Sequence, residues 1–102
     1  MTEQINSEII DVVDSIRNIA DVKKVILFHK KHSVSGKLSG FKICAVIETL
    51  DKKALEKKIY RDIDSEIPFD VVIYTPDEWE DLSQENGTFA HKITMTGCDL
   101  ID

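Results

Sequence analysis

The chain has 102 residues, of which 42% are hydrophobic, and a formal net charge of -6 at pH 7. This composition suits one folded domain with its own core, and it argues against nucleic-acid binding through bulk positive charge. No apolar run approaches the roughly 18 residues of a membrane span, and the polar start MTEQINSE does not resemble a signal peptide. We therefore expect a single cytoplasmic domain over residues 1–102, with no membrane association and no general nucleic-acid binding.

The first half of the chain predicts a helix followed by two strands. A helix over about residues 2–20 is indicated by apolar residues at three- and four-residue steps: Ile5, Ile9, Val12, Val13, Ile16 and Ile19. A continuous apolar run, Val25-Ile26-Leu27-Phe28, predicts a strand that is covered on both faces and ends where His29-Lys30-Lys31-His32 begins a polar connection. The second strand, over about residues 41–48, alternates between two faces, of which one carries Phe41, Ile43, Ala45 and Ile47.

The second half predicts three helices and a third strand. Asp51 is placed to cap a helix that runs to about residue 65, and an apolar strand follows within residues 67–76. Thr75-Pro76-Asp77-Glu78 has the pattern of a capping box, and Asn86-Gly87 is expected to end that helix, from which Trp79 and Leu82 face inward. Another short helix is expected to stop at Gly97, before a small terminal strand in CDLID.

These elements define an α/β fold, an α+β sandwich in which helices cover a small mixed sheet of three to four strands. The connection between the first two strands is too short for a helical crossover, so they should be antiparallel. The third strand returns after a helix. The two cysteines, Cys44 in a predicted buried strand and Cys98 near the end, have neither metal-site nor disulfide-framework spacing, and we interpret both as reduced thiols.

Three stretches together resemble the minimal nucleotidyltransferases of the DNA polymerase beta superfamily. Val25-Ile26-Leu27-Phe28 and Cys44-Ala45-Val46-Ile47 match the family's first two core strands at unbroken spacing. The stretch from Ile67 to Pro76 is similar to the strand that bears the family's third carboxylate, with Asp70 in that position. The resemblance implies a nucleotidyltransferase-like domain in which strand 25–28 lies beside strand 41–48. It also implies that Asp70 lies on a neighbouring strand, near Phe41 and Ile43.

The positions that carry the family's chemistry differ in this chain. His29-Lys30 stands where the family has Gly-Ser, and Phe41 and Ile43 stand where it has two metal-binding aspartates. Two close divalent cations need several carboxylate oxygens, whereas Lys42 adds positive charge and Asp70 alone offers one ligand. A side chain at His29 also obstructs the close approach of backbone amides to phosphate that glycine permits. We therefore predict a pseudoenzyme with no catalytic residue, no metal and no cofactor, whose former cleft is partly filled by Phe41 and Ile43.

Three classes of function remain open at this stage. The first is an inactive nucleotidyltransferase-like protein that binds a ligand or a protein partner, either a small helical protein, as in toxin and antitoxin modules resembling this domain, or a second copy of itself. The second is an active metal-dependent nucleotidyltransferase with an atypical site. The third is a metal-independent nucleotide or anion-binding module, for which the basic candidates are His29, Lys30, Lys31, His32 and Lys42. These residues can also be read as an exposed turn, and Asp70 as a remnant satisfied by local bonds.

Overall fold

A computed structural model describes residues 6–101, which form an α+β fold with four helices and a four-stranded mixed sheet. In chain order the elements are α1 (Ser7–Ile19), β1 (Val22–His32), β2 (Leu38–Ile47), α2 (Lys52–Asp62), β3 (Phe69–Tyr74), α3 (Pro76–Leu82), α4 (Phe89–Thr96) and β4 (Cys98–Asp99). The strands lie in the order β3-β2-β1-β4. The predicted fold class and the number of strands are therefore confirmed.

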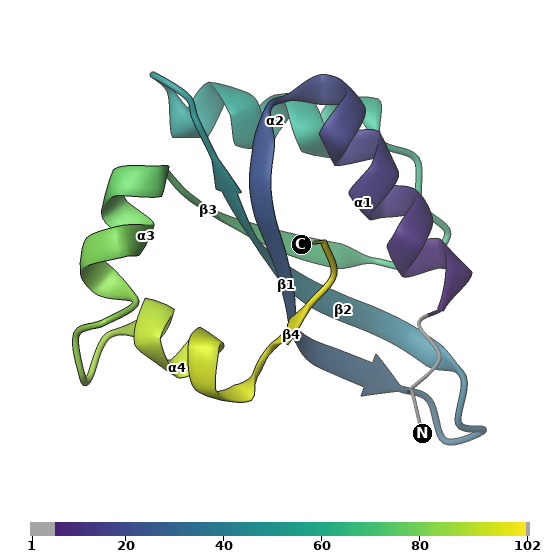
Figure 1. The fold of residues 1–102 in the computed structure, drawn as a ribbon. Coiled ribbons are helices and arrows are strands. Elements are labelled where there is room, and N and C mark those ends of the chain that lie inside the picture. Colours follow the sequence, from purple (N-terminus) through teal and green to yellow (C-terminus); the bar gives the residue numbers. More distant parts are fainter. Residues whose placement is uncertain (1–5, 102) are drawn as a thin grey trace.

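The strand directions also agree with the prediction. β1 and β2 form an antiparallel hairpin, and β3 lies parallel to β2 after the crossover through α2. The short β4 pairs antiparallel with β1 at Ile26 and Leu27. Figure 1 shows α1 and α2 along one side of the sheet and α3 and α4 along the other. The sheet is therefore the middle layer of a sandwich, and each of its faces is covered by a different pair of helices.

The alternation of side chains along the strands divides the core into two parts. One part packs between the sheet and the α1/α2 layer and takes its sheet residues from Val25, Leu27, Phe41, Ile43, Ala45, Ile47, Val71 and Ile73. The other part is smaller and packs against α3 and α4, with Ile26, Cys44 and Ile93 buried and Phe28, Tyr74 and Trp79 beside them. The side of the sheet that carries α4 is thus less completely filled than the side that carries α1.

The first strand is longer than its apolar run predicted. β1 continues through His32, so the segment from His29 to His32 is strand and not a polar connection. The reason is pairing: His29 to His32 lie opposite Lys42 to Leu38 of β2, and backbone hydrogen bonds in a hairpin do not require apolar side chains. The true turn follows at Ser33–Lys37, where Gly36 adopts a φ of 89° in the left-handed region that glycine favours.

Several helix ends differ from the predicted ones. α1 begins after Asn6, whose side chain accepts a hydrogen bond from the Glu8 amide at 2.8 Å, and predicted residues 2–5 lie outside the described range. The predicted cap at Asp51 is confirmed, but α2 ends at Asp62, three residues early. α3 ends at Leu82 and not at Asn86-Gly87, because the Leu82 carbonyl oxygen accepts hydrogen bonds from the Glu85 amide and the Thr88 hydroxyl in the turn that leads to α4. Trp79 and Leu82 of α3 are half-buried.

The predicted capping box at the start of α3 is present and is linked to α2. The Thr75 amide donates to Glu78 Oε1 at 2.9 Å, and the Glu78 amide donates to Thr75 Oγ1 at 3.3 Å. Lys52 Nζ lies 2.9 Å from both carboxylate oxygens of Glu78. The Thr75 amide and then Lys52 hold the pKa of Glu78 below its ordinary value of 4.5, because both interactions favour the charged carboxylate.

We expect Glu78→Gln to weaken the acid sensitivity of the fold. A carboxylate with a lowered folded-state pKa stabilises the protein above its unfolded-state pKa, and this contribution is lost as the pH falls through the folded-state pKa. Glutamine keeps the capping geometry but cannot titrate. The difference in unfolding free energy between the native protein and the variant should therefore be present at pH 7 and shrink below pH 4.5. Urea denaturation at pH 7, 4.5 and 3 measures it.

A matched control is Glu80→Gln on the same helix. Among the residues that the structure describes, the Glu80 side chain makes no hydrogen bond or ion pair. The stability of this variant should run parallel to that of the native protein across the same pH range. If the unfolding free energies of Glu78→Gln and Glu80→Gln differed from that of the native protein by the same amount at each pH, Glu78 would have no specific role.

Candidate functional site

Phe41 and Ile43, the two positions that the resemblance assigns to metal ligands, are core residues. Their exposed fractions are 3% and 0%, and both pack in the cluster between the sheet and the α1/α2 layer. The Phe41 ring stacks against the ring of Phe69 on the adjacent strand, with centroids 5.7 Å apart and planes 16° apart. The structure thus places apolar contacts at both positions, as the sequence predicted.

Asp70 lies on the neighbouring strand but points to the opposite face. In the parallel pairing of β2 with β3, Asp70 is opposite Lys42, while Phe41 is opposite Phe69. Residues opposite each other in paired strands point to the same side, and successive residues alternate. Asp70 therefore shares a face with Lys42 and not with Ile43. The expectation that Asp70 lies near Phe41 and Ile43 holds for the strands and is wrong for the side chains.

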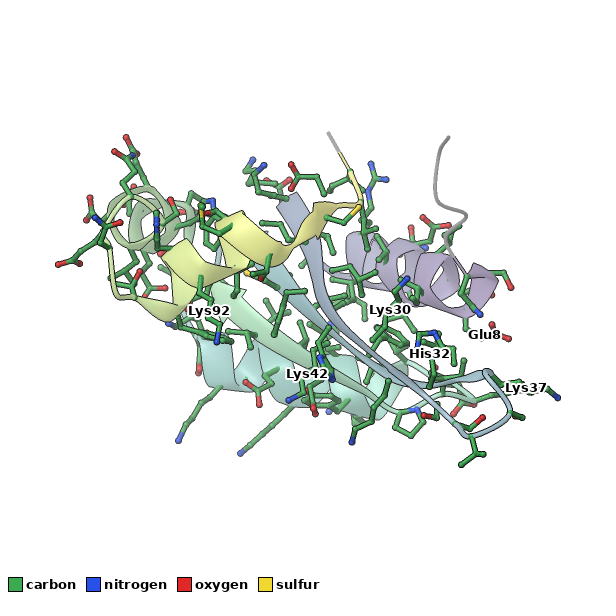
Figure 2. All side chains as sticks on the ribbon, turned by 90° about the horizontal axis from the view of Figure 1, so that it is seen from below. Glu8, Lys30, His32, Lys37, Lys42 and Lys92 are labelled. Atoms are coloured by element: carbon green, nitrogen blue, oxygen red, sulfur yellow. The ribbon has the colours of Figure 1, made fainter. Side chains whose placement is uncertain are left out.

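The same alternation divides the predicted basic cluster. Lys30 and His32 line a groove of about 570 Å³ beside the first turn of α1, together with Glu8. Figure 2 shows Lys30 and His32 beside Glu8, with Lys37 at the far end of the hairpin and Lys92 on α4, away from that group. Lys30 already has an interaction partner. His29, Lys31 and Lys42 belong to the other face of the sheet, so the five predicted residues do not form one site.

A second pocket, of about 470 Å³, lies between α4 and the sheet. Its walls come from four elements and comprise Phe28, His29, Lys42, Asp70, Val72, Phe89, Lys92, Ile93 and Thr96. A β-bulge at Phe28 helps to build it: the register with β2 shifts between Leu27 and His29, which places an extra residue in β1 at this point. The Phe28 and Phe89 rings meet edge to face, with centroids 5.5 Å apart.

The pocket combines an apolar floor with charged side chains. Ile93 is buried and Val72 and Phe28 are half-buried, whereas His29, Lys42, Asp70 and Lys92 are exposed. Within residues 6–101, none of these four charged or titratable side chains makes an ion pair. A smaller groove of about 190 Å³ shares His29, Lys42 and Asp70 and adds Lys31. We call the 470 Å³ space the α4 pocket.

Lys92 was not found by sequence reasoning. It lies fifty residues after Lys42 in the chain, and the two line one pocket only because α4 folds back against β1. Its position in α4, three residues after Phe89 and one before Ile93, places it beside the pocket on the helix surface. No signal in the sequence distinguishes it from the many lysines on α2.

Two other residues of types that often take part in catalysis, a cysteine and a histidine, make structural contacts. Cys44 is buried beside Ile93, and burial raises the pKa of its thiol to about 12, which keeps it protonated at neutral pH. His91, for which the sequence indicated no role, has its ring Nδ1 2.9 Å from the carbonyl oxygen of Ser83, which joins α3 to α4.

The comparisons with known proteins add no support to the resemblance to nucleotidyltransferases, which depends only on the sequence stretches described above. No family model, curated protein or solved structure matches the chain. Over residues 6–101, no group of three or more histidine, cysteine, aspartate or glutamate side chains is arranged to hold a metal ion. The helices in this part of the chain are all too short or too polar to cross a membrane.

Proposed function

We propose that this chain is a nucleotidyltransferase-like protein that does not transfer nucleotides and acts by binding. The observation that carries the proposal is the direction in which three side chains point from the sheet. Phe41 and Ile43 point into the core under α1 and α2, while Asp70 points toward the opposite face of the sheet. Two-cation catalysis needs carboxylates that converge on one point. Even aspartates at positions 41 and 43 would not converge with Asp70 in this register.

The binding surface that the geometry favours is the α4 side of the sheet. A cavity of about 470 Å³ lies within the size range of small-molecule sites, which are typically about 300 to 1,000 Å³. A protein partner, either a small helical protein or a second copy of the chain, would use the same side, where Phe89 is 49% and Met95 is 73% exposed on α4. The pocket, which charged side chains line, favours the small ligand over the protein partner.

Calorimetric titration with manganese or magnesium, with and without ATP, tests the absence of a catalytic metal site. We expect the heats for the native protein and for Asp70→Asn to be the same, because within residues 6–101 Asp70 belongs to no group of three or more histidine, cysteine, aspartate or glutamate side chains that could hold a cation. Tight metal binding that Asp70→Asn abolishes would contradict the proposal.

A transfer assay examines the reaction itself. The protein is incubated with labelled nucleoside triphosphates, manganese and candidate acceptors, and no label is expected on any acceptor. Label transfer that disappears in Asp70→Asn would show an active enzyme with an atypical site. Label transfer that persists in this variant points instead to a contaminating enzyme, and repeated purification of both proteins should remove it.

A further inference from the structure

We infer that the α4 pocket binds a small organic anion, an aromatic ring that carries a phosphate or carboxylate group, without a metal ion. The inference rests on the proposed function, because it names the ligand class of a protein that acts by binding. It is carried by three features of the pocket: its charge, its apolar floor and its aromatic wall.

The first feature is the local sign of the charge. The whole chain has a net charge of -6, yet the pocket brings together Lys42 and Lys92, with His29 beside them, against the single carboxylate of Asp70. A concave, positively charged surface on an otherwise negatively charged protein raises the local concentration of anions. Both lysines lack an ion-pair partner among the described residues, so their ammonium groups are available to an anion.

The second feature is the composition of the floor. Val72, Phe28 and Ile93 give the pocket an apolar base, which a bare inorganic anion would leave uncovered. A ligand with an apolar portion would remove this surface from water, and that is the main source of affinity for small organic ligands. The Thr96 hydroxyl at the edge is already satisfied, because it donates to the Lys92 carbonyl oxygen at 3.0 Å. The pocket therefore fits an amphipathic ligand better than a polar one.

The third feature is the aromatic wall. Phe89 is the first residue of α4 and is 49% exposed, although it already makes an edge-to-face contact with Phe28 at 5.5 Å. The remaining ring surface is available for a second aromatic group, since edge-to-face and offset-stacked aromatic pairs are favourable beyond the burial of their area. This wall explains why the ligand class is a ring and not an alkyl chain, whose contacts would be less directional.

The probes are phenyl phosphate and benzoate, each of which has both a ring and an anionic group. Two half-probes serve as controls: inorganic phosphate has the anionic group without the ring, and benzyl alcohol has the ring without the anionic group. Each is titrated into the ¹⁵N-labelled full chain and followed by NMR. We expect saturable shifts at the Lys42, Val72 and Ile93 amides with phenyl phosphate or benzoate, at a Kd of about 1 mM for so small a ligand. The two half-probes should bind about tenfold more weakly. Absence of saturable shifts with both phenyl phosphate and benzoate overturns the inference.

Variants of the lysines and of Phe89 separate the two parts of the site. Lys42→Ala/Lys92→Ala should weaken phenyl phosphate binding about tenfold, because hydrogen bonds to charged groups are lost. Lys53→Ala/Lys57→Ala on α2 removes the same charge from an exposed surface and should leave the affinity unchanged. Phe89→Ala should weaken phenyl phosphate but not inorganic phosphate. Equal loss in the two double variants, or shifts confined to the groove at Lys30 and His32, would overturn the inference.

Phenyl phosphate titrations with and without magnesium, together with the Asp70 metal titration, distinguish failure of the pocket inference from failure of the proposed lack of catalysis. Phenyl phosphate binding that is unchanged by magnesium supports the metal-independent site. If phenyl phosphate does not bind and the Asp70 metal titration is also negative, the pocket inference fails and the proposed lack of catalysis stands. If an Asp70-dependent metal site is found while phenyl phosphate binds at the α4 pocket without it, the lack of catalysis fails and the pocket inference stands.

Discussion

Replacing Phe41 and Ile43 together by aspartate is expected to unfold the protein at neutral pH. Both side chains are almost fully buried, with exposed fractions of 3% and 0%. Removing a buried phenylalanine or isoleucine side chain costs about 2–5 kcal/mol each, and a buried carboxylate without a partner costs several more. The sum matches or exceeds the roughly 5–15 kcal/mol that stabilises an ordinary domain. Far-UV circular dichroism and urea denaturation at pH 7 measure the loss.

The matched control is Lys42→Asp, which lies between the two positions on the same strand. Its side chain is exposed on the other face of the sheet, so the unfolding free energy should change by only about 1 kcal/mol. Millimolar manganese should not restore the fold of the double variant, because Asp70 cannot reach the α1/α2 face. A double variant that folds with native stability, with or without manganese, would show that positions 41 and 43 are not core positions.

Gly97→Ala is expected to be the most disruptive small substitution in the C-terminal part. A Cβ atom at this position would overlap Ile26 Cγ2 and would lie 2.7 Å from the carbonyl oxygen of Ile93, the acceptor of the Gly97 amide. The neighbouring backbone cannot move without disturbing the end of α4, so we expect a loss of about 1–3 kcal/mol, typical of overpacking. Hydrogen exchange should accelerate at the Leu100 amide, which donates to the Val25 carbonyl oxygen at 2.8 Å.

Gly40→Ala is the control for the glycine change. The nearest atom to a Cβ at Gly40 is the carbonyl oxygen of Pro68, at 3.5 Å, which is an ordinary contact. This variant should keep both the native stability and the slow exchange of the Leu100 amide. If Gly97→Ala were tolerated as well as Gly40→Ala, the junction between α4 and β4 would have to be more adaptable than its packing indicates.

The two faces of the sheet have different roles under these proposals. The α1/α2 face holds most of the core and includes the positions that the resemblance gives to catalysis. The α4 face has a smaller core and leaves room for a pocket. A change of function within such a sheet needs only that the binding side chains come from the alternate positions of the same strands. This arrangement makes Lys42, and not its neighbours Phe41 and Ile43, the residue to test for binding.

The local elements were predictable wherever a few neighbouring residues determine them. Asp51 and Thr75 cap their helices by accepting hydrogen bonds from amides three residues ahead, a pattern that can be predicted from the sequence alone. The alternation from Phe41 to Ile47 also identifies one buried face of β2 before any partner is known. The α+β class and the antiparallel hairpin follow from these elements and from the length of their connections.

Element ends and the composition of the site were less predictable, because distant residues determine both. His29 to His32 look like a loop by composition, yet pairing with β2 makes them strand. The direction in which Asp70 points depends on the register of β3 against β2, and a shift of one residue would reverse it. The resemblance implied a register with Asp70 near Phe41 and Ile43, but the observed pairing places Asp70 opposite Lys42.

The sequence by itself determined the helix caps, the buried alternation of β2 and the absence of aspartates at positions 41 and 43, because these are properties of neighbouring residues. Only the tertiary structure decided that Asp70 faces away from them and that Lys42 and Lys92 share a pocket. The physical reason is that a side chain's face follows from strand register, and the meeting of α4 with the sheet follows from packing between residues far apart in the chain.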